Sequence, residues 1–364
     1  MQVENKKYYP QLDAIRGIAF LSVFIFHTLA NFNTNYLLGK LVKFIVGNMY
    51  MGLDVFFVLS SFLLTFLGIK EYIKNGSFSI KNYFIRRVLR IWPLYYLIMF
   101  FSFVLLKWVK NYFLFQISLP DASWYLFFVA NYYNKDHVFF LKILWTLSVE
   151  EQFYILWGIC LFCFQKHLIK VMVVFTVISI LYNFIGAYYK APIYAHTLCY
   201  LLDMMVGAYA AYTLIFNGKI LNLIAAIQKK GQIVFYSFLP ILFIVYFFLN
   251  NLYGGSYNRV LEEIVRELFV LFIGLVILHQ MLYERSKFSL SKNKFLTYTG
   301  KISFGLYCFH GIIITLIGLL LEKFNIQFPL VVKMLIILCF TYLISTVSYY
   351  YIEKPFLKLK DKVS

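Results

Sequence analysis

Apolar runs of about 20 residues recur from one end of this chain to the other, and each is long enough to cross a hydrocarbon layer about 30 Å thick. Hydrophobic residues make up 62% of the 364 positions, and charged residues only 14%. This composition excludes a disordered chain, a small disulfide-stapled domain and an ordinary soluble protein. The sequence therefore predicts an all-α integral membrane protein with several transmembrane helices.

The hydropathy pattern predicts ten membrane-spanning helices. They cover roughly residues 13–32, 50–69, 88–106, 146–164, 169–187, 194–216, 233–250, 264–283, 302–321 and 329–351. Ten is an even number, so both termini are predicted on the same side of the membrane. Lys and Arg are concentrated in alternate connectors, for example at 70–87 and 285–301, and the positive-inside rule places these connectors and both termini in the cytoplasm.

The longest outward connector, at about 107–145, is rich in aromatic residues. These are Trp124, Tyr125, Phe127, Phe128, Tyr132 and Tyr133. Such a composition suits a segment that lies in the membrane interface. No Gly/Ser-rich, Pro-rich or hydrophilic block marks a second domain, so we expect residues 1–364 to form a single transmembrane domain with no appended soluble domain.

The net charge of +18 does not indicate a nucleic-acid partner, because the basic residues lie in short connectors between apolar runs. Topology and contact with anionic membrane lipid explain charges in such positions. All five cysteines fall inside predicted spans, and one Cys-x-x-Cys pair, Cys160 and Cys163, within a lipid-embedded helix is a poor indication of metal binding. We expect packing roles for the cysteines and no metal site.

The first predicted helix carries three ionisable groups, Asp13, Arg16 and His27. A charge at membrane depth costs about 2.5–3.5 kcal/mol on insertion scales, so such residues are candidates for a functional site. Asp13 and Arg16 are three apart and can pair near the cytoplasmic end, while His27 lies within about 20° of the same face and about 16 Å further along the axis. The alternative is that Arg16 reaches lipid phosphate and His27 makes an interhelical hydrogen bond.

The fourth predicted helix carries Glu150 and Glu151 about one turn below its outer end, at a depth similar to that of His27. A carboxylate beside an imidazole could orient it as the general base that takes a proton from a hydroxyl group. Contact between His27 and Glu150 is a hypothesis at this point. The alternative is a pair of interfacial carboxylates that face water, and this is the favoured interpretation for Glu151.

Arg87 and Arg90 stand at the cytoplasmic start of the third predicted helix. They are three residues apart and so share a helix face, and guanidinium groups bind phosphate oxygens bidentately. Together with Arg16 they could receive an anionic ligand from the cytoplasm. The alternative is a positive flank that retains the helix end in the cytoplasm and contacts lipid phosphate.

Further ionisable groups lie at or near membrane depth. They are Asp54, Asp203, Arg266, Glu267, His279 and His310. Because the sequence assigns none of them a partner, each is interpreted as structural or cavity-lining rather than catalytic.

Five sequence blocks, in order along the chain, resemble the membrane-bound acyltransferase-3 family, whose members O-acylate bacterial surface carbohydrates. The blocks are Leu12-Asp13-Ala14-Ile15-Arg16-Gly17 with His27 eleven residues after the Arg, Gly52-Leu53-Asp54-Val55-Phe56-Phe57-Val58-Leu59-Ser60, Arg87-x-x-Arg90-Ile91-x-Pro93, Trp145 to Tyr154, and Tyr351-Ile352-Glu353-Lys354-Pro355-Phe356. One departure is Ser61, where the family usually has glycine. Many relatives also carry an extracytoplasmic hydrolase-like domain, which this sequence does not contain.

The resemblance implies a ten-helix core in the bacterial cytoplasmic membrane, no permanently bound cofactor, acetyl-CoA or another acyl-CoA as the donor, and a carbohydrate hydroxyl on the outer side as the acceptor. It also implies that Arg16 and His27 are essential, that Arg87 and Arg90 matter, and that Glu150 has a functional role. Further candidates for the site are Asp13, Asp54, Ser60, Glu151 and His310.

Alternatives to direct acetyl transfer remain open at this stage. The acyl group could be succinyl or longer, a covalent acyl intermediate could form, and the acceptor could be O-antigen, capsule, exopolysaccharide, peptidoglycan or a lipid-linked glycan. A carbohydrate exporter or flippase would use the same buried charges to line a passage. An ion or small-molecule permease is the weaker third interpretation. Ester analysis of the surface glycan discriminates among these three classes, and the sequence does not predict an oligomeric state.

Overall fold

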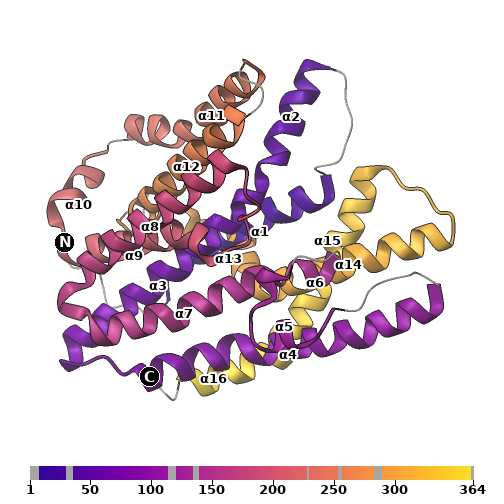
Figure 1. Cartoon of the computed structure of the whole chain (residues 1–364), viewed down its shortest axis with the longest axis horizontal. Coiled ribbons are helices and arrows are strands. Elements are labelled where there is room, and N and C mark those ends of the chain that lie inside the picture. The colour runs from indigo at the N-terminus through magenta and orange to yellow at the C-terminus, as the bar shows by residue number, and fades with distance from the viewer. Residues whose placement is uncertain are drawn as a thin grey trace. The chain divides into compact units, whose positions relative to one another are not determined.

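A computed structural model describes residues 8–29, 36–113, 120–133, 139–227, 229–252, 256–282 and 289–361 (Figure 1). Within these ranges the regular secondary structure is helical and no strand occurs, which confirms the predicted all-α fold. The longer helices are α1 (Pro10–Leu29), α2 (Leu37–Gly47), α3 (Gly52–Asn75), α4 (Ile80–Phe113), α7 (Trp145–Cys163), α8 (Leu168–Tyr189), α9 (Leu201–Phe216), α11 (Lys229–Leu252), α12 (Ser256–Leu282), α14 (Ser303–Lys323) and α15 (Leu330–Ser348). The shorter ones are α5 (Ser123–Leu126), α6 (Phe139–Lys142), α10 (Gly218–Ala225), α13 (Lys294–Lys301) and α16 (Lys354–Asp361).

Each of the ten predicted spans coincides with a helix of the described chain. Eight helical segments there are long and apolar enough to cross a membrane, and they account for all predicted spans except the fourth and the eighth. Those two are α7, which carries two glutamates among its apolar residues, and α12, which carries five charged residues. The protein is therefore a multi-pass membrane protein, and the cytoplasmic location of both termini stays a prediction.

The helix boundaries differ from the prediction by up to eight residues, and one such difference falls at the long outward connector. Helix α4 has 34 residues and continues to Phe113, so the predicted start of the connector at 107 is still helical. Beyond it, Tyr125 of α5 is fully buried, and its backbone carbonyl accepts a hydrogen bond of 2.8 Å from the Tyr95 hydroxyl on α4. This part of the connector packs on protein through Tyr125, while Phe127 is exposed. Residues 114–119 and 134–138 lie outside the described residues.

The chain divides into two compact units, described here one at a time. The first unit contains the described parts of Met1–Phe78, Phe164–Tyr194 and Leu198–Lys301, and the second those of Ser79–Cys163, Ala195–Thr197 and Ile302–Ser364. The first therefore holds α1 to α3 and α8 to α13, and the second holds α4 to α7 and α14 to α16.

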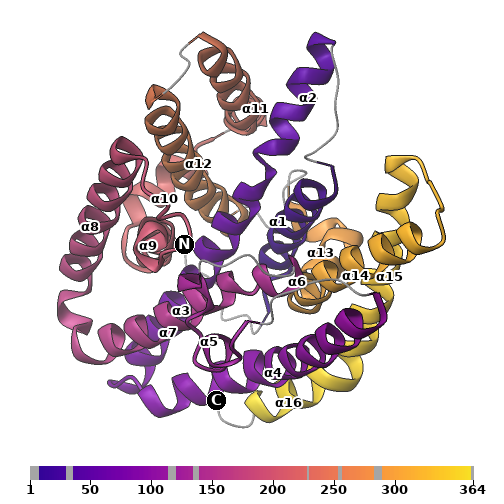
Figure 2. The same ribbon diagram turned by 45° about the vertical axis from the view of Figure 1, so that its right-hand side comes forward.

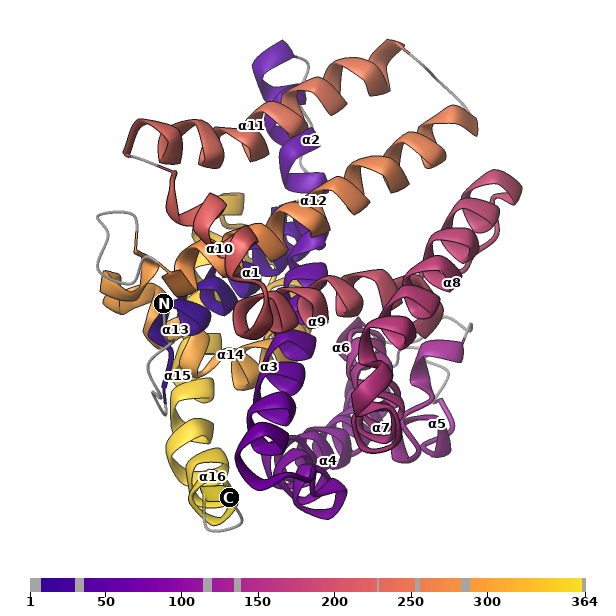
Figure 3. The ribbon, with the colours of Figure 1, turned by 90° about the vertical axis from the view of Figure 1, so that its left-hand side faces the viewer.

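In the first unit, α3 packs closely along α9 (Figure 3). Gly207 of α9 permits this approach, because a side chain there would run into the backbone of Val58 and Phe62. Small residues let membrane helices approach one another in this way. Ser61, which stands where the family usually has glycine, is buried and its hydroxyl donates to the Met204 carbonyl. The missing side chain of Gly207, on the opposing helix, therefore allows the close approach, and Ser61 adds a hydrogen bond between the two helices.

A second close contact joins α1 to α13 (Figure 2). A side chain at Gly17 would overlap the Leu296 carbonyl, and one at Gly300 would overlap the carbonyl of Asp13. Two glycines, one on each helix, therefore allow backbone-to-backbone packing beside Arg16. This packing is a physical reason for glycine to follow the arginine in the first sequence block.

In the second unit, α14 packs against α15 and α4 against α16 (Figures 1 and 2). A π-helical turn, Tyr349–Glu353, separates α15 from α16. Such turns place one extra residue in a helix and occur often at functional sites. Here the turn falls in the closing sequence block, and it buries Glu353 beside Gly305 of α14.

Candidate functional site

Helix α1 carries the first group of candidate residues in the first unit. Arg16 Nη1 lies 2.9 Å from Asp13 Oδ1, as the spacing of three predicted, and both side chains are nearly buried. The helix is continuous from Pro10 to Leu29, so His27 stands eleven residues beyond Arg16, about 16 Å along one axis. One helix thus holds a paired arginine near one end and an imidazole near the other.

An aromatic contact connects the surroundings of His27 to the start of α3. The Phe26 ring lies 5.2 Å from the His27 ring, centroid to centroid, and 5.8 Å from that of Tyr50. The Tyr50 hydroxyl donates a hydrogen bond of 2.8 Å to Glu262 Oε1 on α12. The Phe26 ring therefore lies in contact with both His27 and Tyr50, and Tyr50 is hydrogen-bonded to the Glu262 carboxylate.

A buried ion cluster in the first unit centres on Arg266 of α12. Its Nη2 donates to both carboxylate oxygens of Asp203 at 2.8 Å, and its Nε donates to Asp54 Oδ1 at 3.2 Å. Glu263 lies 3.4 Å from Nη1. Asp203 is completely buried and Asp54 is 2% exposed. Buried charges are tolerated when they are paired and hydrogen-bonded in this way.

The sequence assigned no partners to Asp54, Asp203 and Arg266 and interpreted each as structural or cavity-lining, and the structure supplies the partners. Each lies in the first half of a predicted span that enters the membrane from the same side, at 50–69, 194–216 and 264–283. Opposite charges in the same half of the membrane were therefore available as a signal. The packing of α3 against α9 and of α12 against both helices brings the three side chains together.

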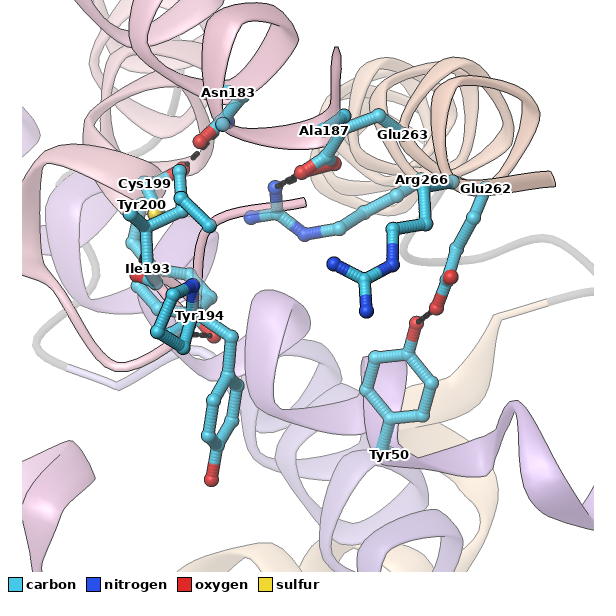
Figure 4. A pocket seen from close by; sticks show the side chains of 14 residues that line it. Tyr50, Asn183, Ala187, Ile193, Tyr194, Cys199, Tyr200, Glu262, Glu263 and Arg266 are labelled. Atoms are coloured by element: carbon cyan, nitrogen blue, oxygen red, sulfur yellow. Dashed lines mark hydrogen bonds and ion pairs between the residues drawn. The ribbon is translucent and has the colours of Figure 1, made fainter. Parts of the chain in front are cut away.

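A pocket of about 400 Å³ lies beside this cluster, within the first unit (Figure 4). Its lining includes Tyr50, Glu262, Glu263 and Arg266 together with residues of α8 and of the segment after it, and Arg259. Figure 4 shows the hydrogen bond from the Tyr50 hydroxyl to Glu262 on one side of the pocket, and the hydrogen bond from the Asn183 amide to the Cys199 carbonyl on another. The Arg266 guanidinium also lies 4.9 Å from the centre of the Tyr200 ring.

In the second unit, Arg87 of α4 makes no ion pair with the residues that the structure describes. Its guanidinium lies 5.9 Å from the centre of the Tyr154 ring, and its Nε is buried with no hydrogen-bond partner among the described residues. The Arg87 charge acts electrostatically on Glu151. Arg90, one turn further on, acts electrostatically on the buried carboxyl of Glu353.

The two carboxylates of α7, also in the second unit, have different surroundings. Tyr154 donates a hydrogen bond of 2.9 Å to Glu150 Oε2, and the Trp92 indole donates one of 3.3 Å to Glu151 Oε2. Glu151 is only 6% exposed, so the expectation that it faces water was wrong. Adjacent helix positions are about 100° apart, and hydropathy alone did not indicate which of the two would turn toward Trp92 on α4.

Two further candidates lie on other helices. His310 of α14 is completely buried, and its Nδ1 lies 2.6 Å from the Tyr307 carbonyl, which makes Nδ1 the donor and leaves Nε2 as the acceptor. Ser60 of α3 is half-buried and precedes Ser61 at the α9 contact.

The predicted site residues are divided between the two units. Asp13, Arg16, His27, Asp54 and Ser60 belong to the first unit, and Arg87, Arg90, Glu150, Glu151 and His310 to the second. The structure brings Asp13 to Arg16, and it pairs Asp54 with an arginine of a distant helix. Sequence reasoning missed Glu263, Trp92, Tyr154 and Glu353 as members of these clusters. Of these, Trp92, Tyr154 and Glu353 lie within three of the five sequence blocks named above.

Comparison with known proteins adds evidence over almost the full length. A family model described as "Acyltransferase domain", that of the acyltransferase-3 family, matches residues 9–350. No solved structure matches the chain. The match runs from the first residues before α1 to the π-helical turn after α15.

Curated relatives include proteins from several bacteria. The peptidoglycan O-acetyltransferase OatA of Listeria monocytogenes is 26% identical over 373 residues, which cover 97% of this chain and 56% of that protein. A putative O-acetyltransferase of Staphylococcus aureus strain COL is 27% identical over 380 residues, covering 98% of this chain and 58% of that protein. A putative peptidoglycan O-acetyltransferase of Bacillus subtilis, YrhL, is 26% identical over 385 residues, covering 97% of this chain and 56% of that protein.

The chain thus spans between 56% and 58% of the length of these relatives. The family model covers the four sequence blocks on α1, α3, α4 and α7. The fifth block, at the π-helical turn, begins directly after the matched region. A helical membrane chain that this model matches from residue 9 to residue 350 is a member of the acyltransferase-3 family.

Proposed function

We propose that this protein transfers an acyl group, acetyl in the first instance, from acyl-coenzyme A in the cytoplasm to a hydroxyl group of a carbohydrate outside the bacterial cytoplasmic membrane. The observation that carries the proposal is α1 itself. Within the region matched by the family model, one continuous helix holds the Asp13–Arg16 pair and, eleven residues further, His27. Relatives whose names specify O-acetyltransferases support acetyl as the group transferred.

His27 is proposed as the general base of this reaction. Its imidazole would take the proton from the acceptor hydroxyl as the hydroxyl oxygen attacks the thioester carbonyl carbon. A carbon–oxygen bond then forms, the carbon–sulfur bond breaks, and the proton passes from His27 to the departing thiolate. The products are an O-acyl carbohydrate and free coenzyme A, so atoms and charge balance without another reactant.

The arginines are proposed as contacts for the donor. Coenzyme A carries phosphates, and guanidinium groups bind phosphate oxygens through charge-assisted hydrogen bonds. Arg87 and Arg90 offer such groups in the first third of α4, toward its predicted cytoplasmic end, and the Nε of Arg87 is a buried donor with no acceptor among the described residues. Arg16 would contribute a third, held in position by Asp13.

The role of Glu150 as the carboxylate that orients His27 stays a prediction, because the two residues belong to different units. For the acceptor, the names of two relatives support peptidoglycan, and a lipid-linked glycan precursor carries the same hydroxyl chemistry. Direct transfer to such a glycan is proposed, since it needs no group beyond those named.

Ester analysis of the surface glycan tests this function. A strain lacking the protein is complemented with the natural chain, with His27→Ala or with His167→Ala, and alkali-released acyl groups are quantified against total glycan. We expect His27→Ala to lower the ester content at least about 100-fold, in the range of general-base catalysis, with unchanged glycan. His167 is an exposed histidine at the start of α8, so its replacement should leave the ester content unchanged.

Two outcomes would contradict the proposal. Equal ester content in the strains with and without the protein would remove the enzyme interpretation. Loss of surface glycan, with the ester content of the remaining glycan unchanged, would indicate an exporter instead. Release of coenzyme A from labelled acetyl-CoA by the purified protein provides an independent test of the donor.

A further inference from the structure

The pocket beside Arg266 has the dimensions and position of a binding site. Its volume of about 400 Å³ lies in the range of small-molecule sites, about 300–1,000 Å³. Its lining comes from the turn at Tyr50, the end of α8, Ala191–Tyr194, Cys199 with Tyr200, and the beginning of α12 (Figure 4). All of these lining residues belong to the first unit.

The charges around this pocket argue against an anionic ligand. Its lining holds the two guanidinium groups of Arg259 and Arg266 and the two carboxylates of Glu262 and Glu263. Behind Arg266, Asp54 and Asp203 add two more carboxylates, both buried. Arg266 uses its donors on these carboxylates and on Glu263, so it has little capacity left for a phosphate. The surplus of negative charge would repel the phosphates of coenzyme A.

The same lining suits a ligand that is uncharged and rich in hydroxyl groups. Carboxylate oxygens of Glu262 and Glu263 accept hydrogen bonds from hydroxyl donors, and these bonds are stronger than neutral ones. Tyr50 and Tyr194 add rings with a polar tip, which can cover the carbon–hydrogen face of a sugar ring. Asn183, 1% exposed, has a side-chain oxygen with no hydrogen-bond partner among the residues that the structure describes. Such an acceptor is satisfied by one more hydroxyl.

The pocket also lies on the side expected for the acceptor. Under the predicted topology, the starts of α3, α9 and α12 face the outside, and α1 ends there. His27 is linked to the pocket wall through Phe26, whose ring lies 5.8 Å from that of Tyr50. A ligand held at Tyr50 and Glu262 would therefore lie in the neighbourhood of the proposed general base.

We propose that the Tyr50–Arg266 pocket is the acceptor subsite and that it binds an uncharged pyranose ring of the carbohydrate. This inference rests on the proposed function for the identity of the reaction, but binding at the pocket can be measured without it. In this arrangement, Arg266 is a positioning residue that holds Glu263, and Glu262 and Glu263 are the groups that contact sugar hydroxyls.

Direct binding tests the inference. The purified full chain in detergent is titrated with a neutral N-acetylglucosamine oligomer and with a uronic acid oligomer of equal length, using saturation-transfer NMR. We expect the neutral oligomer to bind and Glu262→Ala to weaken its binding at least about tenfold, as for loss of one charge-assisted hydrogen bond. Tyr50→Phe, which removes only a hydroxyl group, should weaken it less. Glu322→Ala, at an exposed carboxylate outside the pocket, is the matched control.

The acyl-CoA affinity, measured on the same samples, separates failure of this inference from failure of the proposed function. Unchanged oligomer binding in Glu262→Ala and Tyr50→Phe, or equally tight binding of the uronic acid oligomer, overturns the inference even when ester forms. Oligomer binding that is lost in Glu262→Ala, in a protein that neither binds acyl-CoA nor forms ester, supports the pocket and removes the proposed reaction.

Discussion

Two arginines buried among helices have opposite surroundings in this protein. Arg266, in the first unit, donates to Asp54 and Asp203 and lies beside Glu263, so its charge is more than balanced. Arg87, in the second unit, lies over the Tyr154 ring, and its buried Nε donates to no described group. Both cost free energy to place at membrane depth, yet only the first recovers that cost from protein partners.

The difference indicates two uses of a buried cation. An arginine whose donors are all taken by carboxylates holds helices together, and its removal leaves charges of the opposite sign without a partner. An arginine with an N–H group that no protein acceptor uses is available for a ligand that brings its own negative charge. We therefore expect substitutions at Arg266 to change mainly the stability of the protein, and substitutions at Arg87 to change mainly the binding of acyl-CoA.

The largest effect that this contrast predicts is at Arg266. Arg266→Met should lower the free energy of unfolding by about 3–5 kcal/mol, because Asp54 and Asp203 stay buried without a counter-charge. Chemical denaturation in mixed micelles measures this change. Arg259→Met, at an exposed arginine of the same helix, should change stability by less than about 1 kcal/mol. Adding Asp203→Asn to Arg266→Met should restore part of the loss, and an Arg266→Met protein as stable as Arg259→Met would contradict the structural role.

A change of intermediate size is expected at Arg87. Arg87→Met should weaken acetyl-CoA binding about tenfold or more, because one charge-assisted hydrogen bond to the ligand is lost. The free energy of unfolding should change by less than about 1 kcal/mol. Equilibrium binding of labelled acetyl-CoA and thermal unfolding of the same preparation measure the two quantities. Arg86→Met, at the neighbouring position, is the control. If Arg87→Met unfolded the protein and Arg266→Met did not, the assignment of the two roles would be reversed.

The smallest effect is expected at Trp92. Trp92→Phe keeps an aromatic ring but removes the indole donor to Glu151, and it should cost about 1 kcal/mol, because one hydrogen bond of 3.3 Å is lost. Thermal unfolding at one detergent concentration measures the cost. A second variant, Trp92→Phe with Glu151→Gln, should recover stability. No recovery would mean that the ring, and not the hydrogen bond, supports α7.

Hydropathy and charge predicted the helices of this fold well, since long apolar runs leave few alternatives in a bilayer. A helix stands at each predicted span, and Asp13 pairs with Arg16 because three-residue spacing fixes neighbours on a helix. Boundaries were less accurate where apolar sequence continues beyond the bilayer, as at the end of α4.

Contacts between distant helices were not predictable in the same way. Hydropathy placed Asp54, Asp203 and Arg266 in the same half of the membrane, but it does not indicate which spans are neighbours. The orientation of Glu151 toward Trp92 depends on the rotation of α7 about its axis, which a mainly apolar helix does not reveal in its sequence. The pocket at Tyr50 likewise needs three parts of the chain that are far apart in sequence.

The backbone contact between α1 and α13 has a consequence for how inactive variants would be distributed. Gly300 carries no functional group and is remote from His27 in the sequence, yet any side chain there collides with the carbonyl of Asp13. To relieve the collision, α1 has to slide or turn as a rigid rod, and the imidazole at its other end moves with it. A random search for lost acylation should therefore recover Gly300 and Gly17 as readily as residues that meet the substrates.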